Sequence, residues 1–78
     1  MIQSSFIIIK GVAPCSWCDK AVEVLDKQGL PYMVRILSLD QLREAAERAN
    51  MSTVPIIYHG VNKVGEYKDL IEYLADHI

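Results

Sequence analysis

Two short, mostly apolar runs, separated by one helical segment, constrain the fold of this chain more than any other feature. Residues 5–10 read SFIIIK and residues 32–37 read YMVRIL, and both runs suit strands that are buried on both faces. Between them, residues 17–28 carry apolar side chains at helical spacing, and Gly29 is expected to end that helix. Because a helix connects the two strands, they are predicted to be parallel.

The middle of the chain predicts another helix and a hairpin. Residues 38–41 read SLDQ, a capping-box pattern that opens a helix running to about residue 50. Residues 55–59 and 62–65 form short strands around a turn that contains Gly60. Because the turn is tight, these two strands are predicted to pair with each other.

A last helix is predicted over residues 68–77, with Leu70, Ile71 and Leu74 on one face. The element order is then strand, helix, strand, helix, strand, strand, helix. This order predicts an α/β fold, a mixed four-stranded sheet flanked by three helices, with helices on both faces. A single domain is expected to span residues 1–78.

Composition excludes several classes of function. The net charge is −2 and Lys or Arg residues form no cluster, which argues against nucleic-acid binding. The apolar run near the start, residues 6–9, is too short to span a bilayer or to serve as the core of a signal peptide. We therefore expect a cytoplasmic monomer that binds neither nucleic acid nor membranes.

Cys15 and Cys18 are the only cysteines, and they allow several interpretations. A structural zinc site needs about four ligands, and neither His59 nor His77 has a partner at ligand spacing. A disulfide that closes so short a loop stabilises by roughly 2 kcal/mol at best. The pair could also be two unrelated buried thiols. A redox-active pair is favoured, because the cysteines lie between a strand and the helix of a βαβ unit.

The position of the pair assigns different roles to the two thiols. Cys15 lies at the start of the helix, where free N–H groups and the helix dipole stabilise a thiolate. Cys18 lies one turn further in and is expected to be more buried. Cys15 is therefore predicted to be the attacking thiol and Cys18 the resolving one. Trp17, between them, either covers the sulfur as part of a substrate surface or packs on the helix face.

Three motifs in this order make the chain resemble a glutaredoxin, in the short dithiol form found in bacteria and phages. They are the CSWC motif at residues 15–18, the TVP motif at residues 53–55 and the VGEYKDL motif at residues 64–70. Each motif alone is weak, but their order and spacing are specific. Sequence alone leaves the peptide bond before Pro55 either cis or trans, whereas the resemblance implies a cis bond and a thioredoxin-like fold.

The resemblance implies a glutathione-dependent thiol–disulfide oxidoreductase with no bound cofactor or metal. Glutathione would be the reductant, and the substrates would be disulfide-containing or glutathionylated proteins, ribonucleotide reductase among them. Backbone groups of Val54 would pair with glutathione as an added strand does, and the last helix would hold its γ-glutamyl end. The implied glutathione-binding residues are Trp17, Thr53, Val54, Pro55, Lys68 and Asp69.

Some residues leave alternatives open. Without the resemblance, Lys68 and Asp69 would be read as an ordinary solvated helix start. Reduction by thioredoxin reductase, or a binding module without enzymatic activity, are the rival functions. The chain also departs from the family pattern, because Ser16-Trp17 stand where most glutaredoxins carry Pro-Tyr. Val12 stands where a basic residue is usual, and Glu66 replaces the second glycine of a Gly-Gly pair.

Overall fold

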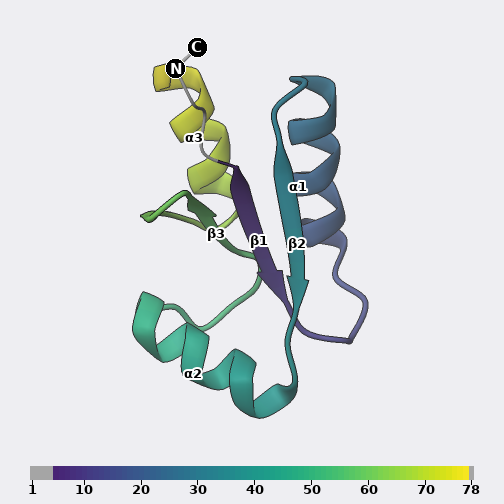
Figure 1. Ribbon diagram of the computed structural model, residues 1–78, viewed down its shortest axis with the longest axis vertical. Helices are drawn as coiled ribbons and strands as arrows, with labels where there is room; N and C mark the ends of the chain where they lie inside the picture. The colour runs from purple at the N-terminus through teal and green to yellow at the C-terminus, as the bar shows by residue number, and fades with distance from the viewer. Residues whose placement is uncertain (1–4, 78) are drawn as a thin grey trace.

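The computed structural model describes residues 5–77 and contains seven helices and strands (Figure 1). Each expected element is present, and its bounds differ from the expectation by no more than one residue at either end. The strands are β1 (Phe6–Lys10), β2 (Tyr32–Ile36), β3 (Ile56–His59) and β4 (Asn62–Gly65). The helices are α1 (Ser16–Lys27), α2 (Leu39–Ala49) and α3 (Tyr67–His77).

The four strands form one mixed sheet in the order β2-β1-β3-β4. β1 and β2 are parallel, as the connecting helix predicted, whereas β3 is antiparallel to both β1 and β4. Gly60 and Val61 join β3 to β4, and Gly60 adopts a φ of 63°, which a glycine tolerates in a tight turn. The predicted mixed sheet and hairpin are confirmed.

The core lies between the sheet and the helices α1 and α3, which lie on one face of the sheet (Figure 1). Each apolar side chain that is fully buried there stabilises the fold by about 1.5–3 kcal/mol. The core residues are Phe6, Ile8, Ala21, Leu25, Ile57, Leu70 and Leu74. Of the three apolar residues expected on one face of α3, Leu70 and Leu74 are buried in the core, whereas Ile71 is 41% exposed. Ile71 lies about 100° around the helix from Leu70 and so leaves the buried stripe.

The prediction that β2 is a buried strand is wrong. Met33 is 54% exposed and Ile36 is 61% exposed, because β2 is an edge strand of the sheet. The expected burial of β1 on both faces is right for one face only. Phe6 and Ile8 are buried, whereas Ile7 and Ile9 are partly exposed on the other face.

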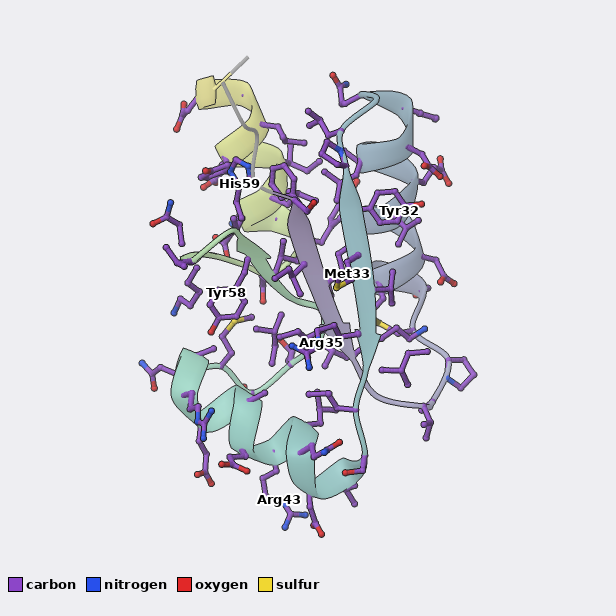
Figure 2. The ribbon with its side chains drawn as sticks, in the orientation of Figure 1. Tyr32, Met33, Arg35, Arg43, Tyr58 and His59 are labelled. Carbon is purple, nitrogen blue, oxygen red and sulfur yellow. A yellow bond between two sulfur atoms is a disulfide. The ribbon has the colours of Figure 1, made fainter. Side chains whose placement is uncertain are left out.

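That second face is largely open, because α2 lies beyond one end of the strands (Figure 1). Ile7 pairs with both Met33 and Tyr58, so the three side chains share this face, and Figure 2 shows Met33 and Tyr58 on the side turned to the viewer. Where this face of the sheet meets α2, a hollow is lined by Arg35, Tyr58 and Ala45 of α2. The predicted placement of helices on both faces is therefore only partly right, because α2 borders the second face and does not cover it.

The helix ends have the local structure that the sequence predicts. Gly29 follows α1 with a φ of 66°, and the Leu30 N–H donates to the Leu25 carbonyl at 3.0 Å, which closes the last turn. Ser38 and Gln41 form the expected capping box at the start of α2. Within the described residues, none of the helices is both long and apolar enough to cross a membrane.

Candidate active site

Cys15 and Cys18 form a disulfide at the start of α1, with their Cα atoms 5.2 Å apart. Cys15 is the N-cap residue of the helix, and the Cys18 N–H points at its Sγ at 3.1 Å. Cys18 is 1% exposed, whereas Cys15 is partly exposed. The expected difference in burial is confirmed, and Cys15 carries the more exposed sulfur of the pair.

The loop before β3 carries the second predicted motif. The peptide bond between Val54 and Pro55 is cis, as the resemblance implied. Pro55 is buried, and Val54 and Thr53 lie at the surface next to it. The Thr53 hydroxyl donates to the Glu66 carboxylate at 3.4 Å, which ties this loop to the start of α3.

The turn between β4 and α3 carries the third motif and depends on a glycine. Gly65 has a φ of 120°, and a Cβ atom at this position would overlap the carboxylate of Asp69. That carboxylate accepts the Glu66 N–H at 3.0 Å, so Asp69 caps the start of α3. The close approach of Asp69 therefore requires a residue without a side chain at position 65.

The three motifs meet around a hollow of about 380 Å³, here called the Lys68 hollow. Its wall comes from the start of α1, the loop before β3 and the start of α3. The lining residues are Trp17, Thr53, Val54, Pro55, Glu66, Tyr67 and Lys68. Five of the six predicted glutathione-binding residues are thus brought together, whereas Asp69 is not among the lining residues and its carboxylate caps α3.

Trp17 lies at the surface and not in the core. Its side chain is 53% exposed, and its ring lies 5.4 Å from the ring of Tyr67, measured between centroids. The Lys20 Nζ lies 4.6 Å from the centroid of the Trp17 ring, a cation–π contact. Tyr67 was not among the predicted site residues. Its place in the motif just before Lys68 was the only signal that could have identified it.

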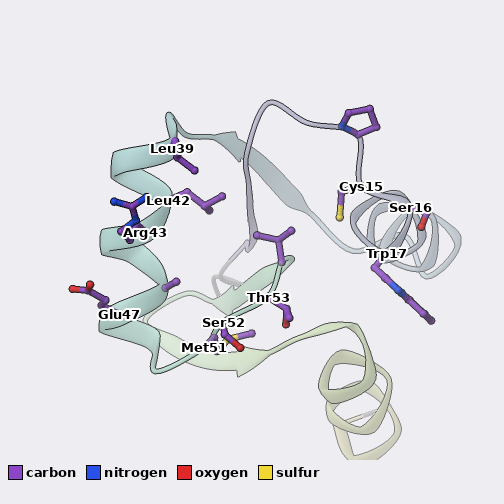
Figure 3. A pocket seen from close by; sticks show the side chains of 13 residues that line it. Cys15, Ser16, Trp17, Leu39, Leu42, Arg43, Glu47, Met51, Ser52 and Thr53 are labelled. Carbon is purple, nitrogen blue, oxygen red and sulfur yellow. The ribbon is translucent and has the colours of Figure 1, made fainter.

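A second and larger hollow, here called the α2 groove, lies between α2 and the start of α1 (Figure 3). It has a volume of about 780 Å³ and shares Trp17, Thr53 and Val54 with the Lys68 hollow. Cys15 lies in its wall. The α2 residues that line it are Leu39, Leu42, Arg43, Ala46 and Glu47. The sequence did not predict this groove, because only the tertiary structure brings α2 opposite Cys15.

Within residues 5–77, no group of three or more His, Cys, Asp or Glu side chains is arranged to hold a metal ion. The reactive groups that the structure places at this site are the sulfur atoms of Cys15 and Cys18. A partly exposed sulfur at a helix start, next to a buried partner, is the arrangement used for thiol–disulfide exchange. Together with the thioredoxin-like sheet, it defines the class of thiol–disulfide oxidoreductases.

A sequence model of the Glutaredoxin family matches residues 6–64, and the chain belongs to this family. Membership in the family implies thiol–disulfide oxidoreductase activity. No curated protein matches the chain.

Solved structures of glutaredoxins share the fold. The buckwheat glutaredoxin–glutathione complex superposes with a TM-score of 0.74 at 18% identity, covering 95% of this chain and 71% of that chain. The holo form of glutaredoxin C1 from Populus tremula x tremuloides gives a TM-score of 0.73 at 21% identity, covering 96% and 71%. At these identities the structures establish the four-stranded thioredoxin-like fold, which confirms the predicted fold class.

Proposed function

We propose that this chain is a glutathione-dependent dithiol oxidoreductase that reduces protein disulfides and glutathione mixed disulfides through Cys15 and Cys18. The observation that carries the proposal is the position of the Lys68 hollow. It shares Trp17, Thr53 and Val54 with the groove that contains Cys15, so a ligand in the hollow lies next to the disulfide.

The chemistry of the Lys68 hollow suits a small peptide with carboxylates. Lys68 supplies a positive charge, and the start of α3 supplies free N–H groups and the positive end of the helix dipole. Val54 offers backbone groups beside the cis peptide bond, where an extended peptide can add as a short strand. A structurally similar glutaredoxin from buckwheat is described as a complex with glutathione.

Reduction of a protein disulfide takes two exchange steps. The Cys15 thiolate attacks one sulfur of the substrate, which forms a mixed disulfide and releases the other substrate sulfur as a thiolate. The Cys18 thiolate then attacks the Cys15 sulfur, which forms the Cys15–Cys18 disulfide and releases the second substrate thiolate. The substrate gains two electrons and, from water, two protons, and the cysteine pair loses the same two electrons. Two glutathione molecules return the pair to the dithiol and leave as glutathione disulfide.

Reduction of a glutathionylated protein needs Cys15 alone. The Cys15 thiolate attacks the glutathione sulfur, so the protein leaves as a thiolate and glutathione stays bound to Cys15. A second glutathione thiolate attacks the sulfur of that bound glutathione, which regenerates Cys15 and forms glutathione disulfide. Both routes need reduced glutathione, which fits the cytoplasmic location that we propose for this chain.

The decisive experiment is a coupled assay with NADPH, glutathione reductase, glutathione and a small glutathione mixed disulfide. We expect turnover that depends on Cys15 and saturates with glutathione. The same protein is tested in parallel with thioredoxin reductase in place of glutathione and its reductase. Turnover with thioredoxin reductase alone would contradict glutathione dependence, and no turnover with either system would contradict enzymatic activity.

A further inference from the structure

The α2 groove is a second surface that reaches the disulfide. The Lys68 hollow lies on the α3 side of the loop before β3, whereas the α2 groove lies on its other side, and both include Trp17 and Val54. Cys15 lies in the wall of the α2 groove (Figure 3). A group joined to Cys15 that does not occupy the Lys68 hollow therefore has this groove open to it.

The α2 side of the groove is apolar where it faces Cys15. Leu39, the first residue of α2, is 70% exposed, and Figure 3 shows Leu42 pointing from the helix toward the groove. Ala46 and Met51 extend the same wall toward the loop before β3. An apolar side chain that covers Leu39 would remove water from both partners, which is favourable by about 25 cal/mol per Å² of apolar surface.

The outer rim of the groove carries two charges. Arg43 and Glu47 both line the groove from α2, and within residues 5–77 neither forms an ion pair. On the same helix, Arg48 is paired with Glu44 at 2.8 Å and lies outside the groove. The rim charges are thus available to a partner, whereas the charge of Arg48 is already satisfied within the helix.

We propose that the α2 groove binds the protein half of a mixed disulfide on Cys15. The occupant is an extended polypeptide segment that carries the reacting cysteine, with an apolar residue beside it that covers Leu39 and an acidic residue that reaches Arg43. The argument is continuity with the reacting sulfur, together with the apolar wall and the unpaired Arg43. This inference rests on the proposed function, and it assigns the protein substrate and glutathione to opposite sides of the loop before β3.

The test compares two disulfides in the glutathione-coupled assay. One is the glutathione mixed disulfide of 2-mercaptoethanol, and the other is a short synthetic peptide disulfide with leucine next to the cysteine and aspartate three residues further on. We expect Leu39→Ser to raise the KM for the peptide about fivefold, as the loss of roughly half of a leucine burial implies. Turnover of the small disulfide should stay within about twofold. Val61→Ser, which changes a 95% exposed apolar residue on the β3–β4 turn, is the matched control and should change neither.

The charge of the rim is tested separately. Arg43→Glu should raise the KM for the aspartate peptide about threefold to tenfold, in line with an exposed ion pair turned into a repulsion. It should lower the KM for a companion peptide that has lysine in place of aspartate. Arg48→Glu makes the same change in net charge on the same helix and should not discriminate between the two peptides.

Several results would overturn the inference. One is that the wild-type protein turns over the small disulfide but does not reduce the peptide. Another is that Leu39→Ser loses activity equally with both substrates. A third is that Arg43→Glu does not discriminate between the aspartate and lysine peptides. Loss of peptide reduction in Ile36→Ser, with Leu39→Ser unchanged, would place the substrate at the β2 edge. Activity with the small disulfide reports the proposed function independently, so failure of the groove and failure of the function are distinguishable.

Discussion

Glu66 offers the sharpest test of how this chain differs from the usual glutaredoxin pattern. Its side chain lines the Lys68 hollow and accepts the Thr53 hydroxyl at 3.4 Å. Its backbone is not in the left-handed region, which Gly65 occupies instead with a φ of 120°. A glycine at position 66 is thus not needed for backbone reasons, and charge is the property to change. Glu66→Gln removes the charge and keeps both the shape and the acceptor for Thr53.

The magnitude follows from Coulomb's law. Glutathione carries a net negative charge, and a carboxylate about 8 Å from Glu66 is repelled by about 0.5 kcal/mol in a water-like dielectric and about 2 kcal/mol at an effective dielectric of 20. Glu66 is exposed, so the lower part of this range applies. We expect Glu66→Gln to lower the KM for glutathione about twofold to fivefold.

The assay is the glutathione-coupled reaction at two ionic strengths. The gain in Glu66→Gln should shrink at high salt, because the Debye length falls from about 8 Å at physiological salt to about 3 Å at 1 M. Glu72→Gln is the matched control, since Glu72 is an exposed glutamate on the same helix outside the hollow. An unchanged KM in Glu66→Gln, or an equal change in Glu72→Gln, would refute a role for Glu66 in glutathione binding.

Three further predictions concern the cysteines and one glycine. Cys15→Ser should abolish all activity, whereas Cys18→Ser should keep the turnover of a glutathionylated substrate, and the opposite pattern would reverse the assigned roles. In the reduced protein the pKa of the Cys15 thiol should lie well below about 8.5, because it caps α1 and faces the Cys18 N–H. Its alkylation rate should therefore already be high at neutral pH and level off above that pKa, and an apparent pKa of about 8 or higher would contradict the proposed thiolate. Gly65→Ala should destabilise the fold by about 1–3 kcal/mol in urea unfolding, because it combines an unfavourable φ with an overlap on Asp69. Gly29→Ala, where φ is 66° but an added Cβ atom would meet nothing within 4 Å beyond the adjacent residues, should cost less, and equal costs would mean that the overlap is relieved.

The elements of this fold could be predicted because their signals are local. A capping box at Ser38 and a glycine after α1 set helix ends through bonds within one turn of the chain. The difference in burial between Cys15 and Cys18 could likewise be predicted, since a strand before the pair and a helix after it set which sulfur is exposed. These features depend on residues that are neighbours in the sequence, so they can be predicted from the sequence alone.

The burial of the edge strand β2 and of Ile71 on α3 could not be predicted from the local sequence. The run YMVRIL is as apolar as a central strand, but β3 pairs on the other side of β1 and leaves β2 at the edge. Ile71 similarly falls outside the α3 stripe that contacts the sheet. Burial depends on which element packs on which, and several arrangements of equal local quality compete for the same apolar surface.

The sequence by itself determined the elements, their order and the reactive pair. Only the tertiary structure brought Trp17, Val54 and Lys68 to one hollow and α2 opposite Cys15. These residues lie far apart along the chain, and no local rule links their positions. Their distances are set by the pairing of β3 with β1 and by the packing of α3 against α1. The reactive pair is encoded locally, whereas the two hollows beside it arise from contacts across the whole fold.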